Sequence, residues 1–320
     1  MTFGYCRRGI RRRLCHAAAP ELSIYTINPC TLGLIQIDRT FPLLPSRLPI
    51  TVVVPTLNEE RMLTECLGRL SRFECLVVVD SGSVDRTREI AREFGAEVVD
   101  FKWNGKFPKK RNWFLRSYPV RTPWILFLDA DEFVDDSFCD QLERVLVDTP
   151  HVGFWLNYDR WFLGSRLVHG ESNRKLALFR FGAGEYERID ESSWTSLDME
   201  VHEHPILIGT IGEISNRIDH RDFRSMEHWL AKHNQYSTWE AHRIAALIEP
   251  GNPVRALFSP RQRRKYAALG HWWLPPAHFL YSYLLRLGFL DGHAGLTYAI
   301  AKSFYFWQIG VKLRQIKPLG

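Results

Sequence analysis

The sequence predicts an α/β fold with a mainly parallel sheet, flanking helices and a C-terminal amphipathic helical extension. Between residues 50 and 128, short apolar runs rich in β-branched residues alternate with segments of helical period. This alternation is typical of βαβ units, in which consecutive strands run parallel. Beyond residue 270, apolar side chains recur at helical spacing between basic flanks, which predicts the extension.

Four strands are expected, and each is an almost continuous apolar run of the kind found in sheets covered on both faces. They span residues 50–54, 76–79, 96–101 and 124–128. Helices should fill the intervals. Asn58 is expected to cap the first, Ser83 the second, and Gly95 to close the second, while a third should cover 109–117. A further helix is expected over residues 225–247.

Composition and charge exclude several classes of protein. The 320 residues are 45% hydrophobic and 13% aromatic, which excludes a disordered or collagen-like chain. Six cysteines without a CxxC pair form neither a disulfide framework nor a zinc site, and favour a reducing compartment. The net charge of +6 is concentrated at the two ends around an acidic middle, unlike the even basic surface of a nucleic-acid binder. Basic ends suit an anionic surface such as the inner face of a membrane, or are simply solvated.

These patterns divide the chain into three parts. Residues 1–48 are expected to be a poorly structured basic leader, 49–224 a catalytic domain, and 225–320 a helical extension. The apolar stretches 274–290 and 294–311 are interrupted by charged side chains and are marginal as membrane spans. They suit helices lying in a membrane interface, or a helix pair that closes the core.

Three of the expected strands end in polar residues, at 55–58, 80–83 and 129–131. Because the carboxyl ends of parallel strands meet at one edge of a sheet, we expect these residues to form a ligand site. Asp129 and Asp131 follow a buried strand directly and suit Mg²⁺ or Mn²⁺ bound together with substrate phosphates, although a solvated acidic turn has the same pattern. Asp80 is placed to accept a hydrogen bond from a base or ribose.

Four motifs in this order resemble those of family 2 glycosyltransferases with the Rossmann-like GT-A fold. They are the runs from Thr51 to Glu59, from Asp80 to Thr87, from Lys110 to Asn112 and from Asp129 to Asp131. Two further runs, 201–203 and 288–292, resemble the branch that contains lipopolysaccharide-core β-glucosyltransferases.

The resemblance implies a role for each matching residue. Pro55, Thr56, Asn58 and Glu59 would line the nucleotide pocket, and Asp80 would contact the base, typically uracil. Lys110 and Arg111 would touch the nucleotide or its phosphates, and Asp129 would hold ribose or sugar. Asp131 would ligate the divalent metal.

The catalytic base is expected downstream of the metal motif. Glu203 is the candidate, with Asp198 and Glu200 as alternatives. In a rival interpretation a neighbouring histidine, His202, is a third metal ligand and Glu203 is structural. His220 is weighed as a pocket residue or a structural histidine. One face of the helix at 225–247 is expected to bind a phosphorylated acceptor or merely to pack; it carries Lys232, His233, Tyr236 and Glu240.

Together the residues and the resemblance predict an inverting, metal-dependent glycosyltransferase. It would move a hexose from a nucleotide sugar, typically UDP-linked, to a glycan or lipid-linked acceptor in lipopolysaccharide or other cell-surface polysaccharide synthesis. We expect it in the cytoplasm, peripheral on the inner membrane face. One alternative is an inactive GT-A-like scaffold, which the intact Asp80, Asp129 and Asp131 disfavour. Another is a nucleotidyltransferase, which would need a glycine-rich loop after the first strand, where the chain has no glycine.

Overall fold

The computed structural model describes residues 47–171, 173–188, 205–222, 224–248 and 268–316. All of them belong to one of the two units into which the chain divides, residues 46–320.

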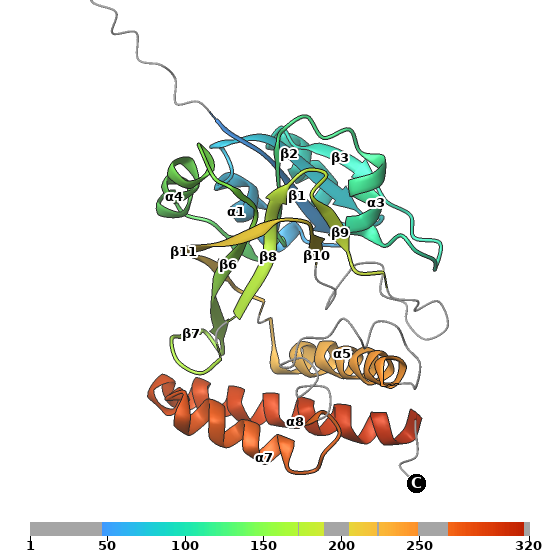
Figure 1. The fold of residues 1–320 in the computed structure, drawn as a ribbon, viewed down its shortest axis with the longest axis vertical. Helices are drawn as coiled ribbons and strands as arrows, with labels where there is room; N and C mark the ends of the chain where they lie inside the picture. Colours follow the sequence, from blue (N-terminus) through green and yellow to red (C-terminus); the bar gives the residue numbers. More distant parts are fainter. Residues whose placement is uncertain (1–46, 172, 189–204, 223, 249–267, 317–320) are drawn as a thin grey trace, which may run out of the picture. The chain divides into compact units, whose positions relative to one another are not determined.

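The first half of the sheet has the predicted parallel arrangement (Figure 1). β1 (Leu48–Thr56) lies between β2 (Phe73–Asp80) and β4 (Trp124–Phe127), and β3 (Glu97–Asp100) extends the sheet beyond β2. All three pairings are parallel, and Asp80 lies opposite Thr56 in the register. The predicted α/β class is therefore confirmed, with strands that differ by up to three residues at their ends from those expected.

The second half of the sheet is mixed. β8 (Asn173–Arg180) runs antiparallel to β4 and to β6 (His151–Phe162), while β11 (Thr210–His220) runs parallel to β6. β5 (Glu132–Phe133) pairs with β11 at this edge, and β7 (Ser165–Leu167) pairs with β6. This sheet therefore has nine strands among the described residues. β9 (Gly184–Tyr186) and β10 (Pro205–Leu207) form a separate two-stranded sheet.

Helices cover both faces of the parallel half. α1 (Glu60–Gly68), α2 (Thr87–Glu93) and α4 (Asp136–Leu146) bury their apolar stripes in one core, and α3 (Lys110–Ser117) packs on the opposite face. Two expected caps are wrong. Asn58 adopts a left-handed φ of 56° one residue before the N-cap of α1, and Ser83 precedes the N-cap of α2 by three residues. Their side chains instead join the two loops, because Asn58 N donates to Ser83 Oγ and Val84 N donates to Asn58 Oδ1.

The C-terminal helices form a layer of their own in Figure 1. α5 (Met226–Leu247) begins at Ser225, whose side chain accepts from His228 N. α7 (Leu274–Phe279) continues into a π-helical segment, η2 (Leu280–Leu285), and a 3₁₀ turn, η3 (Gly288–Asp291), leads into α8 (Gly292–Ile316). α8 packs against α5 and α7. The layer is joined to β6 by a cluster in which Phe162 packs with Trp229 and Tyr298.

The start of α8 is fixed by Asp291, within the 288–292 run that the sequence singled out. Its carboxylate accepts hydrogen bonds from the backbone N–H groups of Val168 and His169 and contacts His169 Nδ1. A Cβ on Gly295 would lie 2.0 Å from the carbonyl oxygen of Gly288, so this turn needs glycine. None of the helices in the described ranges is long and apolar enough to cross a membrane.

Candidate active site

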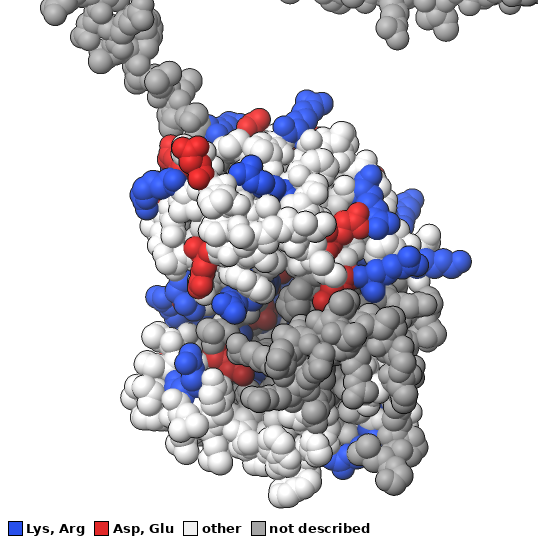
Figure 2. All heavy atoms as spheres, viewed as in Figure 1, with Lys and Arg blue, Asp and Glu red and all other residues white. Residues whose placement is uncertain are grey.

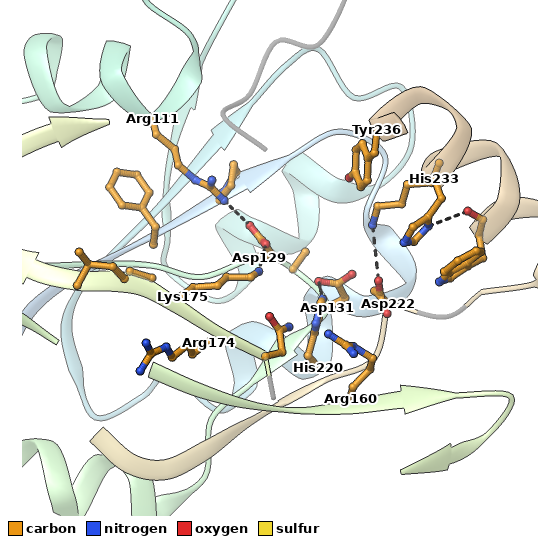
Figure 3. Close-up of a pocket in the computed structure, with 18 of the residues that line it drawn as sticks. Arg111, Asp129, Asp131, Arg160, Arg174, Lys175, His220, Asp222, His233 and Tyr236 are labelled. Carbon is orange, nitrogen blue, oxygen red and sulfur yellow. Dashed lines mark hydrogen bonds and ion pairs between the residues drawn. The ribbon is translucent and has the colours of Figure 1, made fainter. Parts of the chain in front are cut away.

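A cavity of about 400 Å³ lies where the carboxyl ends of β1 and β4 meet β6, β8, α5 and α8. It contains carboxylates from the β4 end and cations from every wall (Figure 3). Two of the three expected strand ends, those of β1 and β4, therefore contribute to one cavity, whereas residues 80–83 after β2 are not among its lining residues.

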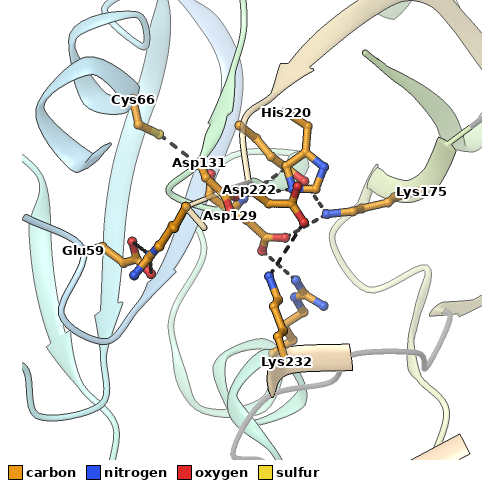
Figure 4. Close-up of polar contacts among 11 residues, drawn as sticks. Glu59, Cys66, Asp129, Asp131, Lys175, His220, Asp222 and Lys232 are labelled. Carbon is orange, nitrogen blue, oxygen red and sulfur yellow. Dashed lines mark hydrogen bonds and ion pairs between the residues drawn. The ribbon is translucent and has the colours of Figure 1, made fainter. Parts of the chain in front are cut away.

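Asp129, which lies two residues after the end of β4, is held by two cations. Its Oδ1 accepts from Arg111 Nη2 at 2.9 Å and its Oδ2 from Lys175 Nζ at 2.8 Å. Lys175 also pairs with the buried Glu132, whose Oε2 accepts from Asp129 N at 3.1 Å. Figure 4 shows Lys175 reaching from β8 towards this group. Although burial opposes it, the charges of Lys175 and Arg111 keep the pKa of Asp129 well below its usual range.

The pKa values of Lys175 and Glu132 are shifted by the same network. Burial lowers the pKa of Lys175, but Asp129 and Glu132 outweigh it and hold the net pKa above the usual value. Burial raises the pKa of Glu132, with the charge of Lys175 opposing the shift. The three groups form one buried ionic unit.

Asp131 stands apart from that unit. Its Oδ1 lies 3.6 Å from His220 Nε2, and its side chain is 18% exposed. His220 Nδ1 is buried and has no hydrogen-bond partner within the described part of the chain. His220 thus reaches the cavity, where it contacts the second aspartate of the motif.

The described side chains were tested for a metal site. Among them, no three His, Cys, Asp or Glu groups come together as a preformed cluster. Mg²⁺ needs none, because it is usually held by one or two carboxylates together with substrate phosphates and water. Asp131 is the cavity carboxylate that no lysine or arginine of the described residues pairs, so it fits such an ion.

The remaining expected nucleotide residues fall into two groups. Pro55 and Glu59 line the cavity, with Glu59 paired to Arg224 at 2.5 Å. Thr56, Asn58, Asp80 and Lys110 are not among the residues that line it. Lys110 Nζ donates to Thr56 O, which braces the end of β1.

Asp80 is fully buried at the end of β2. Its carboxylate accepts from the backbone N–H groups of Gly82 and Ser83 and from the hydroxyls of Thr56 and Ser83. These four bonds fix the turn after β2, and the expected contact of Asp80 with a base stays a prediction.

The expected base and histidine ligand, Glu203 and His202, lie outside the described residues, as do the alternatives Asp198 and Glu200. Pro205, the first described residue after them, lines the cavity.

The helical wall combines cations with aromatic rings. α5 contributes Trp229, Lys232, His233 and Tyr236, and α8 contributes Tyr298 and Lys302. The His233 ring stacks on Trp229 with centroids 3.5 Å apart, and burial lowers its pKa to about 3. Glu240, on the same predicted helix face, is instead buried beside Arg243 at 3.9 Å.

Sequence reasoning missed Lys175, Arg160 and Asp222, all of which line the cavity. One signal was present for Lys175, since it directly precedes the buried apolar run 176–179 on β8. Arg160 and Asp222 had none, because only the pairing of β6 with β11 brings them to this edge.

Comparison with known proteins gives the class. Residues 51–199 match the family model described as Glycosyl transferase family 2. The lipopolysaccharide core biosynthesis glycosyltransferase LpsC of Rhizobium meliloti is 25% identical, over 82% of this chain and 93% of that protein. An uncharacterized glycosyltransferase of Rickettsia typhi is 24% identical, over 83% and 87%. Residues 51–199 are therefore a family 2 glycosyltransferase domain, and the chain is a glycosyltransferase.

Two solved structures are similar at a lower level. Glucosyl-3-phosphoglycerate synthase of Mycobacterium tuberculosis, in complex with Mn²⁺, UDP and its product, gives a TM-score of 0.29 at 25% identity, covering 35% of this chain and 44% of that one. Residues 1–349 of S. aureus TarS give 0.37 at 18% identity, covering 84% and 92%. With TM-scores this low, no detail of the site follows from either.

Proposed function

We propose that this glycosyltransferase is inverting and metal-dependent, and moves a hexose from a UDP-sugar to a lipid-linked or other glycan acceptor in lipopolysaccharide or cell-surface polysaccharide synthesis. The observation that supports it best is the contrast within the β4 motif. Asp129 is neutralised by Arg111 and Lys175, whereas Asp131 keeps its carboxylate in the cavity with no lysine or arginine of the described residues paired to it. The pathway is supported by the name of the LpsC relative.

The side chains have separate parts in this proposal. Asp131, with His202 as a further ligand, would hold Mg²⁺ or Mn²⁺, which neutralises charge on the diphosphate leaving group. Asp129 keeps oxygen lone pairs for a sugar hydroxyl while its two cations fix its orientation. Arg111 and Lys175 add positive potential at the same edge.

The transfer needs a base near the acceptor. The acceptor oxygen bonds to the anomeric carbon as the bond from that carbon to the diphosphate breaks, and the acceptor proton must be removed. Glu203 would accept it, because it lies two residues before Pro205, which lines the cavity. Inversion follows from a single in-line displacement.

The donor assignment is tested by calorimetry with UDP, GDP and CMP, each with and without Mn²⁺. Wild-type protein should bind UDP in a Mn²⁺-dependent manner, and Asp131→Ala should lose that dependence while keeping its melting temperature. Binding of GDP or CMP alone would change the donor class. A folded protein that binds none of the three would contradict the donor site.

We further propose that the outer face of the C-terminal helices rests on the inner membrane surface, with the catalytic unit in the cytoplasm. An apolar groove lies between α7 and α8. Trp307, which lines it, is more than half exposed, and so are Trp272, just before α7, and Leu285, at the end of η2. Exposed Arg286 directly follows η2 and exposed Arg314 lies on α8, and the surface over α7 and α8 in Figure 2 is mostly uncharged. Apolar and aromatic side chains with cations at their border suit an anionic interface.

Co-sedimentation with vesicles tests this placement. Protein should pellet with vesicles of phosphatidylcholine containing phosphatidylglycerol, and less with phosphatidylcholine alone. The double variant Trp272→Ser, Trp307→Ser should stay in the supernatant. Equal sedimentation of the variant and the wild type would contradict it.

A further inference from the structure

The cations of the cavity are arranged differently at its two ends. At the β4 end, Arg111 and Lys175 both bind Asp129 directly. At the helical end, Arg160 and Lys232 have no carboxylate within 3.5 Å among the described residues, the nearest pair being Lys232 Nζ and Asp222 Oδ2 at 3.9 Å.

Arg160 is the more informative of the two. It is half-buried on β6, opposite His220 in the register, and its guanidinium lies 4.8 Å from the ring centroid of Tyr298. Among the described residues it forms no hydrogen bond or ion pair with a side chain. A guanidinium carries five donors, so a half-buried one with no acceptor among the described side chains is able to bind an anionic ligand. Figure 3 shows Arg160 beside His220 and Asp222, facing the cavity.

Among the described residues, the two carboxylates nearest to Arg160 each have another partner. Asp222 Oδ2 lies 3.9 Å from Lys232 Nζ. Burial raises the pKa of this carboxyl, but the charges of His220, Lys232 and Arg160 outweigh burial and hold the pKa below its usual value. Glu171 is hydrogen-bonded to His278 at 2.8 Å. Lys302 of α8 adds a third cation to the same wall.

The aromatic side chains indicate which class of ligand would bring a negative charge to Arg160 and Lys232. Trp229, Tyr236 and Tyr298 line the same wall, and aromatic faces bind sugar rings well. His233, neutral because burial depresses its pKa, adds no charge of its own. A sugar that carries a phosphate or a carboxylate matches this combination.

We infer that Arg160 and Lys232 bind an anionic group on the acceptor, so that the enzyme takes a phosphorylated or acidic sugar rather than a neutral one. This inference rests on the proposed function, since it assigns the donor to the β4 end of the cavity. It names the charge of the acceptor, which the family assignment leaves open.

The test uses pairs of sugars that differ only in charge. Binding of glucose 6-phosphate against glucose, and of galacturonate against galactose, is measured by saturation-transfer NMR on protein with and without UDP and Mn²⁺. The charged member of a pair should bind about 10-fold more tightly, and the preference should shrink as the salt concentration rises from about 0.05 to about 0.5 M. A preference for only one pair identifies whether the anion is a phosphate or a carboxylate.

Variants tie the preference to these residues. Arg160→Gln and Lys232→Gln should each reduce it, and the double variant should bring both members to within about 2-fold of each other. Arg160→Lys should restore part of it. Arg92→Gln, the same charge change on an exposed residue of α2, is the matched control and should leave the preference intact.

Three results would overturn the inference. They are equal binding of charged and neutral sugars, a preference that survives in the double variant, and loss of UDP affinity in Arg160→Gln, which would place Arg160 at the donor. If wild-type protein fails to bind UDP at all, the proposed function fails, while the charge preference measured without UDP still decides this inference.

Discussion

The two ends of the cavity differ in how their charges are balanced. At the β4 end, Lys175 and Arg111 both form ion pairs with Asp129, and Lys175 also pairs with Glu132. At the helical end, Arg160 stacks on Tyr298 without an acceptor among the described residues. The described residues of the protein balance the charges at the first end, whereas we propose that a ligand completes the second. The difference teaches that substitutions at the first end should cost stability, and those at the second should cost recognition.

The largest effect is expected from Lys175→Met. Removing this cation leaves Asp129 and Glu132 buried side by side without compensation, which should lower the free energy of unfolding by about 3–5 kcal/mol. Urea denaturation measures it. Adding Glu132→Gln should recover part of the loss, and a single variant as stable as the wild type would show that the ionic unit is not structural.

Asp131→Asn should separate activity from stability. It removes the charge proposed to hold the metal, so UDP release from the donor should fall by about 10²–10³-fold in kcat. Because Asp131 has no buried cationic partner among the described residues, the unfolding free energy should change by less than about 0.5 kcal/mol. A drop in stability comparable to that of Lys175→Met would remove the contrast between the two aspartates.

His233 sets a pH dependence at the helical end. Burial lowers its pKa in the folded protein to about 3 from an ordinary value of 6.5, so protons bind the unfolded chain more readily between these values. Stability is therefore fully present above pH 6.5 and is lost as the pH falls, by about 2 kcal/mol at pH 5. Denaturation at pH 7 and pH 5 should show a smaller difference in His233→Gln than in the wild type. The control, His293→Gln at an exposed position, should keep the full difference.

The smallest effect is expected at Asn58, in the loop between β1 and α1. Asn58→Gly keeps the left-handed φ of 56° and loses the bond to Val84 N, so it should cost about 0.5–1 kcal/mol. Asn58→Ala should cost more, because alanine also strains at this φ. Thermal melts of the two variants give the order, and a more stable alanine variant would contradict the assigned backbone role.

Sequence reasoning worked where the information was local. Runs such as 50–54 and 124–128 show buried strands directly, and the residues after them, including Asp129, had to lie at one edge once the strands were parallel. The caps at Asn58 and Ser83 failed because these side chains bond across to each other's loop, which no helical period reveals.

The helical end of the cavity could be foreseen only in part. Lys232 and His233 were recognised because they share a helix face. Arg160 lies 72 residues earlier, and it meets them through the packing of Phe162 against Trp229 and Tyr298. Such a contact depends on tertiary packing between segments whose own patterns do not refer to each other.

The contacts of Asp291 have a consequence for genetic screens of this enzyme. The carboxylate of Asp291 ties the residue just before α8 to residues 168 and 169, and α8 contributes Tyr298 and Lys302 to the cavity. A screen for loss of activity would recover changes at Asp291, Gly288 and Gly295 alongside those at the cavity itself. Such mutants would be mistaken for substrate-contact mutants, although the changed residues hold α8 in place and do not line the cavity.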